Sequence, residues 1–456
     1  MNRVISRVRI TLLLILFLVG GFALFTAEFL AKSEQWVLFN GSPHVYNGNG
    51  LNLGILTDRD GALLVDMTDG KTYSQAAELR TAFVHWTGDR QGNIAPVIAN
   101  FYYDKIVNYD PVTGMYAYGE TTPLVKLTLS AKIQMVAMEA MGEYKGTVAV
   151  YNYKTGELLC AVSTPDFDPE YPPDLSGEGK EEYDGVYLNR FIQSSYTPGS
   201  IFKLVTTAAA LETIPDIMEQ TFVCSGTVEY GVDRVTCEQA HGTLTLKQAF
   251  ARSCNCSFAQ IADQLGGETL ERHAAQFGIT EKLSFDGFTT SSGSVTAGGE
   301  APVQVAWSAI GQHKDLINPC SFLTFVGAVA SGGNGMMPYV VSEIADGNET
   351  VYTGRGVESG RIMSSETAAT LQSFMRNNVE NYYGEEAFRG LTVCAKSGTA
   401  EVGGEKRPNA MFVGYVADSE CPLAFIVAIE DGGYGRPVCV PVIGEILREC
   451  KAQMMG

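Results

Sequence analysis

The sequence has little positive charge, and this excludes one large class of partners. It carries 32 lysines and arginines against 51 aspartates and glutamates, so its net charge is −19 over 456 residues. A surface with this excess of negative charge repels phosphate backbones, and we therefore expect no binding to nucleic acid. The sequence also lacks internal repeats of about 20 to 50 residues, which excludes solenoid folds.

Patterns that bind metals or build disulfide scaffolds are also scarce. Ten cysteines are too few for a disulfide-rich domain, and no Cys-x-x-Cys pair or His-Glu-x-x-His motif indicates a metal site. One pair stands apart, because Cys224 and Cys237 flank VEYGVDRV, which is typical of a hairpin turning at Tyr230 and Gly231. Outside a membrane these two cysteines could close a small disulfide bond. We expect the other eight cysteines to be buried as small apolar side chains.

Only one long apolar run is present, and it lies near the N-terminus. Residues 10–27 contain no charged side chain, and 18 residues of helix span about 27 Å, close to the hydrocarbon thickness of a bilayer. Three arginines precede the run, so the positive-inside rule predicts a cytoplasmic tail over residues 1–9 and an anchor over residues 10–30, with the rest outside. A cleaved signal peptide and a buried soluble helix are the alternatives, and the length of the run favours the anchor.

The remaining chain divides into two parts. Residues 31–143 combine short apolar runs with Gly and Asn breaks, and we expect a small, irregular pedestal domain there. Residues 144–456 begin with two strand-like runs within 146–163, and they end with two more within 411–430 and a helix over 442–450. This order predicts an α/β domain of the α+β type, in which helices flank a central antiparallel sheet that joins early and late strands.

The first of three chemical clusters is Ser200-Ile-Phe-Lys203. Pro198 and Gly199 break the chain just before it, so Ser200 is expected in the first turn of a helix. The spacing of three places the Lys203 amine on the same helix face, where a desolvated, neutral lysine is able to take the serine proton. Alone, this pattern is weak, since two common residues at this spacing occur by chance in long chains.

The second cluster is Ser253-Cys254-Asn255, at the end of a helix-like stretch. Its hydroxyl could relay a proton and its amide could hold a substrate peptide, although helix capping is the simpler interpretation of the triplet alone. The third cluster is Lys396-Ser397-Gly398-Thr399 in a predicted strand, where a lysine and two hydroxyls could bind a carboxylate. A second Lys-Thr-Gly, at residues 154–156, fits a hairpin turn, and we assign it to structure.

Together and in this order, the three clusters resemble the Ser-x-x-Lys, Ser-x-Asn and Lys-[Thr/Ser]-Gly set of penicillin-binding proteins and serine β-lactamases. The resemblance covers residues 146–450, and Thr57-Asp-Arg-Asp-Gly61 is similar to the non-catalytic domain of class B members. It implies a penicillin-binding transpeptidase domain, similar in fold to β-lactamases, behind a pedestal and a membrane anchor.

The resemblance also implies a reaction and its residues. The enzyme would be a D,D-transpeptidase acting on peptidoglycan stem peptides, acylated by β-lactams and needing neither metal nor organic cofactor. Ser200 would be the nucleophile, Lys203 its base and Ser253 the group that passes the proton on, with the backbone N–H groups of Ser200 and Thr399 forming the oxyanion hole. The substrate-binding residues would be Asn255, Lys396, Ser397, Gly398 and Thr399.

Other functions share these clusters. A D,D-carboxypeptidase would use water as acceptor, and a β-lactamase would hydrolyse the drug; the anchor and the pedestal favour transpeptidation over both. A β-lactam sensor and a non-catalytic scaffold of a wall-synthesis complex are alternatives from another class. We expect a single-pass protein of the cell membrane with its catalytic domain outside, and a membrane glycan polymerase is a candidate partner.

Overall fold

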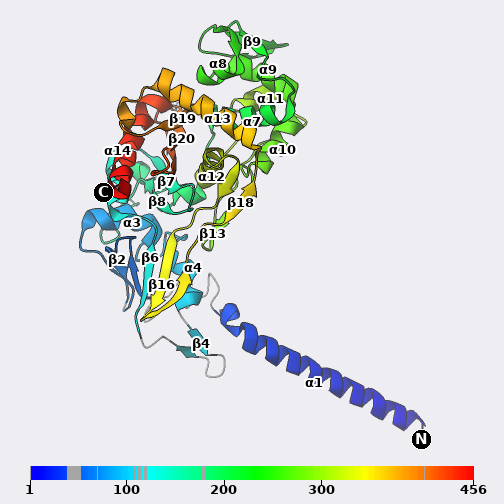
Figure 1. Cartoon of the computed structure of the whole chain (residues 1–456). Helices are drawn as coiled ribbons and strands as arrows, with labels where there is room; N and C mark the ends of the chain where they lie inside the picture. The colour runs from blue at the N-terminus through cyan, green and yellow to red at the C-terminus, as the bar shows by residue number, and fades with distance from the viewer. Residues whose placement is uncertain are drawn as a thin grey trace.

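The computed structural model describes most of the chain, namely residues 2–37, 53–68, 70–106, 108–110, 115–117, 121–176, 180–404 and 406–455. Figure 1 shows an elongated arrangement in which helix α1 (Asn2–Val37) projects from one end of a folded body. That end of the body holds a six-stranded sheet, and a five-stranded sheet lies farther along. Strand β9 (Thr221–Cys224) and helix α8 (Leu246–Ala251) lie at the opposite end.

The five-stranded sheet is the centre of the fold, and its neighbouring strands are all antiparallel. Its order is β19-β20-β21-β7-β8, so the two earliest strands join the three latest ones, as the sequence predicted. The turn between β7 and β8 holds the second Lys-Thr-Gly, which confirms its assignment to structure. The strands are β7 (Gly146–Asn152), β8 (Leu158–Thr164), β19 (Val393–Ala400), β20 (Asn409–Val416) and β21 (Leu423–Ile429).

Helices cover both faces of this sheet, which explains why its strands are apolar throughout. Val150 and Phe412 face α5 (Ala131–Met141) and α14 (Gly435–Met455), which pack together on one side. The alternate side chains face the helices that carry the chemical clusters. These and the other helices of the domain are α6 (Arg190–Gln193), α7 (Lys203–Thr213), α8 (Leu246–Ala251), α9 (Asn255–Leu265), α10 (Gly267–Gln276), α11 (Pro302–Ala309), α12 (Pro319–Ala330) and α13 (Ser365–Asn378).

The six-stranded sheet combines strands from both halves of the chain. Its order is β17-β16-β6-β1-β2-β3, and β16 and β17 come from residues 341–353. The boundary that we propose between residues 143 and 144 therefore divides the sequence but does not divide this sheet, because both parts of the chain contribute strands to it. The strands are β1 (Ile55–Thr57), β2 (Leu63–Asp66), β3 (Thr72–Tyr73), β6 (Pro123–Leu127), β16 (Val341–Asp346) and β17 (Glu349–Thr353).

The segment expected to be irregular is more ordered than the sequence indicated. Besides its strands it contains α3 (Ala77–Thr87) and α4 (Ile98–Ile106). Asp58 is buried, and its carboxylate accepts hydrogen bonds from the N–H groups of Ala62 at 2.7 Å and Ala131 at 2.9 Å. This carboxylate links the start of α5 to the six-stranded sheet. Short strands held by such tertiary contacts are present where the sequence indicated irregular structure.

Helix α1 confirms the predicted apolar segment. Among the described helices it is the one long and apolar enough to cross a membrane, over Arg3–Ser33, and its apolar side chains are exposed. Its extent exceeds the predicted anchor of residues 10–30 because polar turns continue the helix at both ends.

His85 gives the fold a predicted dependence on pH. It is buried in α3 with its Nε2 2.8 Å from the Val186 carbonyl oxygen, and burial lowers its pKa to about 4. Because the unfolded histidine binds a proton below about pH 6.5, the unfolded state holds more protons between pH 6.5 and 4, and acid favours unfolding. As the pH falls over this range, we expect the free energy of unfolding of the wild type to drop by about 3 kcal/mol relative to that of His85→Gln. Denaturant unfolding of the detergent-solubilised chain measures this difference. A difference that stays constant with pH would contradict the prediction.

Candidate active site

Ser200 lies in a short 3-10 helix, η2 (Gly199–Phe202), that presses against strand β19. Gly199 has a φ of +54°, and its N–H donates to the Gly311 carbonyl at 2.8 Å. A Cβ at this position would lie 2.3 Å from the Thr399 carbonyl oxygen, so the turn requires glycine. The glycine before the serine therefore allows Ser200 to reach the edge strand of the sheet.

Lys203 is the first residue of α7, and its amine contacts Ser200 of its own cluster and both Ser253 and Asn255 of the second cluster. The side chain is fully buried, and its Nζ lies 3.2 Å from Ser200 Oγ. The same amine donates to Ser253 Oγ at 3.1 Å and to Asn255 Oδ1 at 2.7 Å. Burial lowers the pKa of the Lys203 amine to about 8, which makes the neutral form accessible near neutral pH.

The second cluster lies at the end of the expected helical stretch and separates it from a second helix. Helix α8 ends at Ala251 and α9 starts at Asn255, with Ser253 between them at a φ of +50°. Neither Ser253 nor Asn255 caps α9, because its N-cap residue is Cys254 and no side chain closes the cap. The helix-capping interpretation is therefore wrong, and the left-handed residue is what brings the hydroxyl to the lysine.

The third cluster supplies a second buried lysine. Lys396 lies on β19, and its Nζ donates to Ser253 Oγ at 3.3 Å and to the Ser397 carbonyl at 2.8 Å. Burial and the neighbouring charge of Lys203 lower the pKa of the Lys396 amine. The Ser253 hydroxyl thus lies between two lysine amines, a position suited to passing a proton.

Gly398 and Thr399 lie beside the nucleophile turn. A Cβ on Gly398 would lie 2.9 Å from Ile201 Cγ2, so β19 can approach η2 only with glycine at this position. The hydroxyl of Thr399 accepts a hydrogen bond from the Gly435 N–H at 3.4 Å. All eight predicted residues of the three clusters therefore gather around one place.

Sequence reasoning missed Tyr383, which supports the third cluster. It ends the π-helical turn η3 (Val379–Tyr383), and its hydroxyl oxygen lies 3.1 Å from both Ser397 N and Ser397 Oγ. Nothing in the spacing of residues 379–383 marks them as part of a site. Only the packing of η3 against β19 brings this phenol to Ser397.

Removing the Tyr383 hydroxyl should weaken the site without destroying it. In Tyr383→Phe the N–H and the hydroxyl of the half-buried Ser397 lose a partner, which water can replace in the folded protein but not in the same position, so the loss is about 0.5–1.5 kcal/mol. We expect acylation by a fluorescent penicillin to slow about tenfold while the midpoint of thermal unfolding changes little. The rates are compared with those of Tyr382→Phe, the preceding tyrosine, for which we expect no change.

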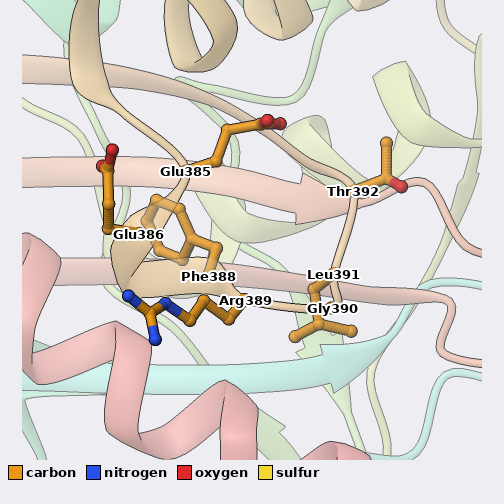
Figure 2. Close-up of a pocket in the computed structure, with 7 residues that line it drawn as sticks. All are labelled: Glu385, Glu386, Phe388, Arg389, Gly390, Leu391 and Thr392. Atoms are coloured by element: carbon orange, nitrogen blue, oxygen red, sulfur yellow. The ribbon is translucent and has the colours of Figure 1, made fainter.

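The clusters open into a cleft of about 980 Å³. Its lining combines residues of all three clusters with Trp307, Tyr434 and Arg436, so an extended peptide would meet both hydroxyls and positive charge. A smaller hollow of about 410 Å³ lies over the continuous segment 385–392, shown in Figure 2. Its one hydroxyl, that of Thr392, donates to Asp418 at 2.8 Å, so this hollow offers no nucleophile.

The structure corrects the predicted cysteine pairing. The hairpin is present as β10 (Thr227–Tyr230) and β11 (Asp233–Thr236), but Cys224 and Cys237 are free thiols. Each sulfur lies near His241 Nδ1, at 3.6 Å for Cys224 and 3.4 Å for Cys237. The two thiols therefore share an imidazole neighbour instead of a bond to each other.

Known proteins agree with this fold. The family model of the penicillin binding protein transpeptidase domain matches residues 146–448. Peptidoglycan D,D-transpeptidase PbpA of Mycolicibacterium smegmatis is 27% identical over 337 residues, covering 68% of this chain and 67% of that protein. Stage V sporulation protein D of Bacillus subtilis is 29% identical over 348 residues, covering 71% of this chain and 53% of that protein.

Solved structures lead to the same class. The D,D-transpeptidase domain from Eggerthella lenta superposes with a TM-score of 0.74 at 25% identity, covering 88% of this chain and 98% of that one. Penicillin-binding protein A from M. tuberculosis, solved as an imipenem acyl-enzyme complex, gives 0.74 at 22% identity with 90% and 100% covered. The fold is therefore the mixed α/β fold of penicillin-binding transpeptidases. With two thirds of its length matched by the family model, the chain belongs to the penicillin-binding protein transpeptidase family.

Proposed function

We propose that this chain is a peptidoglycan D,D-transpeptidase that works through a Ser200 acyl-enzyme. The observation that carries the proposal is the buried Lys203 amine, which lies within hydrogen-bond distance of both the Ser200 and the Ser253 hydroxyls. A nucleophile, a base and a relay group thus meet in one cleft, within a domain whose relatives are named D,D-transpeptidases.

In the acylation step, Ser200 Oγ attacks the carbonyl carbon between the two D-alanines. Lys203 takes the serine proton as the Oγ–C bond forms. The C–N bond then breaks, and the proton reaches the departing D-alanine amine through the Ser253 hydroxyl. The products are free D-alanine and an ester on Ser200.

The neighbouring groups stabilise this step. The N–H groups of Ser200 and Thr399 would hold the developing oxyanion, since the close approach of η2 to β19 places these two residues side by side. The substrate carboxylate would bind the hydroxyls of Ser397 and Thr399 within the positive field of Lys396. Asn255, held by the Thr236 carbonyl at 2.9 Å, would orient the peptide.

An amine from a second stem peptide would then attack the ester and form the crosslink. The apolar helix α1 supports a chain anchored in the cell membrane with residues 1–9 in the cytoplasm and the cleft outside, where stem peptides lie. At this place a membrane glycan polymerase is a candidate partner, because it would deliver uncrosslinked strands.

The full chain in detergent tests this function. We expect covalent labelling by a fluorescent penicillin, and we expect mass spectrometry to show both D-alanine and a crosslinked product from a peptide ending in D-Ala-D-Ala with an acceptor amine. Hydrolysis without crosslinking would favour the carboxypeptidase alternative. Rapid turnover of a chromogenic cephalosporin would favour a β-lactamase, and the absence of any acylation would favour a scaffold.

A further inference from the structure

Four soft metal-binding side chains converge at the edge of the active-site cleft. Cys224, Cys237, His241 and Cys254 place one ligand atom each within 4.8 Å of every other, and we call them the Cys3His cluster. Cys224 and Cys254 are buried, whereas Cys237 and His241 are partly exposed and line the cleft.

Three of the six distances between ligand atoms match the edges of a zinc tetrahedron, and all six lie within 4.8 Å. Zinc binds sulfur at about 2.3 Å and nitrogen at about 2.0–2.1 Å, so a tetrahedral site has edges of about 3.8 Å between sulfurs and about 3.6 Å between sulfur and nitrogen. The Sγ atoms of Cys237 and Cys254 are 3.9 Å apart. The two sulfur-to-Nδ1 distances of 3.6 and 3.4 Å to His241 agree equally well.

The cluster joins four separate segments of the chain. Cys224 ends β9 (Thr221–Cys224), and His241 directly precedes β12 (Gly242–Thr245), which pairs with β9. Cys237 directly follows β11, and Cys254 is the middle residue of the second cluster, Ser253-Cys254-Asn255. A single ion would therefore fasten two small two-stranded sheets to the turn that carries Ser253 and Asn255.

We propose that the chain binds one zinc ion through the Cys3His cluster, and that this ion positions the Ser253–Asn255 turn. Four protein ligands complete the tetrahedron, so the ion is structural and leaves no position for substrate. Three thiolates and an imidazole select zinc over magnesium or calcium, which prefer oxygen ligands. The four ligands act as positioning residues, because none of them belongs to the proton path between Ser200 and Ser253.

Metal analysis of the purified full chain tests the site directly. We expect about one zinc per chain, and cobalt substitution should produce the thiolate charge-transfer and strong visible absorption of a tetrahedral sulfur site. Cys237→Ser and His241→Ala should each lower the zinc content markedly. Cys160→Ala, which removes a buried thiol of β8 far from the cluster, should keep it. Less than one tenth of an equivalent of zinc together with no cobalt spectrum, or a Cys224–Cys237 disulfide in the unreduced protein, would overturn the proposal.

Removal of the metal tests the positioning role, and this arm rests on the proposed function. Displacing catalytic groups by about an ångström costs on the order of a hundredfold in rate, so we expect chelator-stripped protein to acylate at least tenfold more slowly. Added zinc should restore the rate, and added magnesium should not. An unchanged rate in metal-free protein would overturn the positioning role. Bound zinc without any labelling would instead refute the proposed function and leave the metal site standing.

Discussion

The Ser200→Ala protein is expected to show no covalent labelling by a fluorescent penicillin and no release of D-alanine from a D-Ala-D-Ala peptide. In the proposed reaction the covalent bond forms on Ser200 Oγ, and the other hydroxyl near Lys203, that of Ser253, lies 3.1 Å from the amine and serves as its relay partner. Loss should be complete within detection, because removing the nucleophile removes the intermediate itself and not only its stabilisation.

Ser195→Ala provides the matched control. Ser195 lies five residues upstream, and its hydroxyl donates to the Ser292 carbonyl at 3.0 Å outside the three clusters. This variant should label at the wild-type rate. Labelling that survives in Ser200→Ala, with the modified peptide mapped by mass spectrometry to another residue, would overturn the assignment of the nucleophile.

Replacing Lys203 with methionine should slow acylation about a thousandfold, within the range of 10²–10⁴ that general-base catalysis contributes. Methionine has nearly the same length, so the buried space stays filled. The carbonyl of Ser253, which accepts from Nζ at 2.6 Å, and the amide of Asn255 lose their donor. Stopped-flow measurement of the acylation rate, with thermal unfolding to monitor the fold, separates the loss of the base from a loss of structure.

The second Lys-Thr-Gly offers the control for this change. Lys154 begins the same Lys-[Thr/Ser]-Gly pattern as the third cluster, but its side chain is exposed in the turn after β7. Lys154→Met should leave both the acylation rate and the stability unchanged. A Lys203→Met protein that acylates within tenfold of the wild type would show that another group takes the proton.

Local patterns predicted the parts of the fold whose neighbours lie close along the chain. The hairpin of β7 and β8 and the pair of late strands are apolar runs separated by turn residues, and such runs identify buried strands without long-range information. The six-stranded sheet could not be predicted in this way. Its β6 and β16 pair across more than two hundred residues, and each is short and only partly apolar.

The residues of the candidate active site also fall into those that local spacing predicts and those that only packing brings together. The three clusters could be recognised because each keeps its spacing within one turn or strand, and their order along the chain matches a known family. Tyr383 has no such spacing, since its contact with Ser397 depends on how η3 packs on β19. The ligands of the Cys3His cluster are spread over thirty residues, and only the Cys237-x-x-x-His241 spacing resembles a metal pair.

The sequence by itself determined the family and the apolar helix, and it supplied the candidate catalytic residues, because all three depend on residue identity over short spans. The tertiary structure decided which atoms meet. It placed the Ser253 hydroxyl between two lysine amines through a single left-handed residue, and it brought three thiols to one imidazole in place of the disulfide bond that their spacing suggested. These outcomes depend on how separate segments pack, and the free energy of packing is a property of the whole fold and not of any one segment.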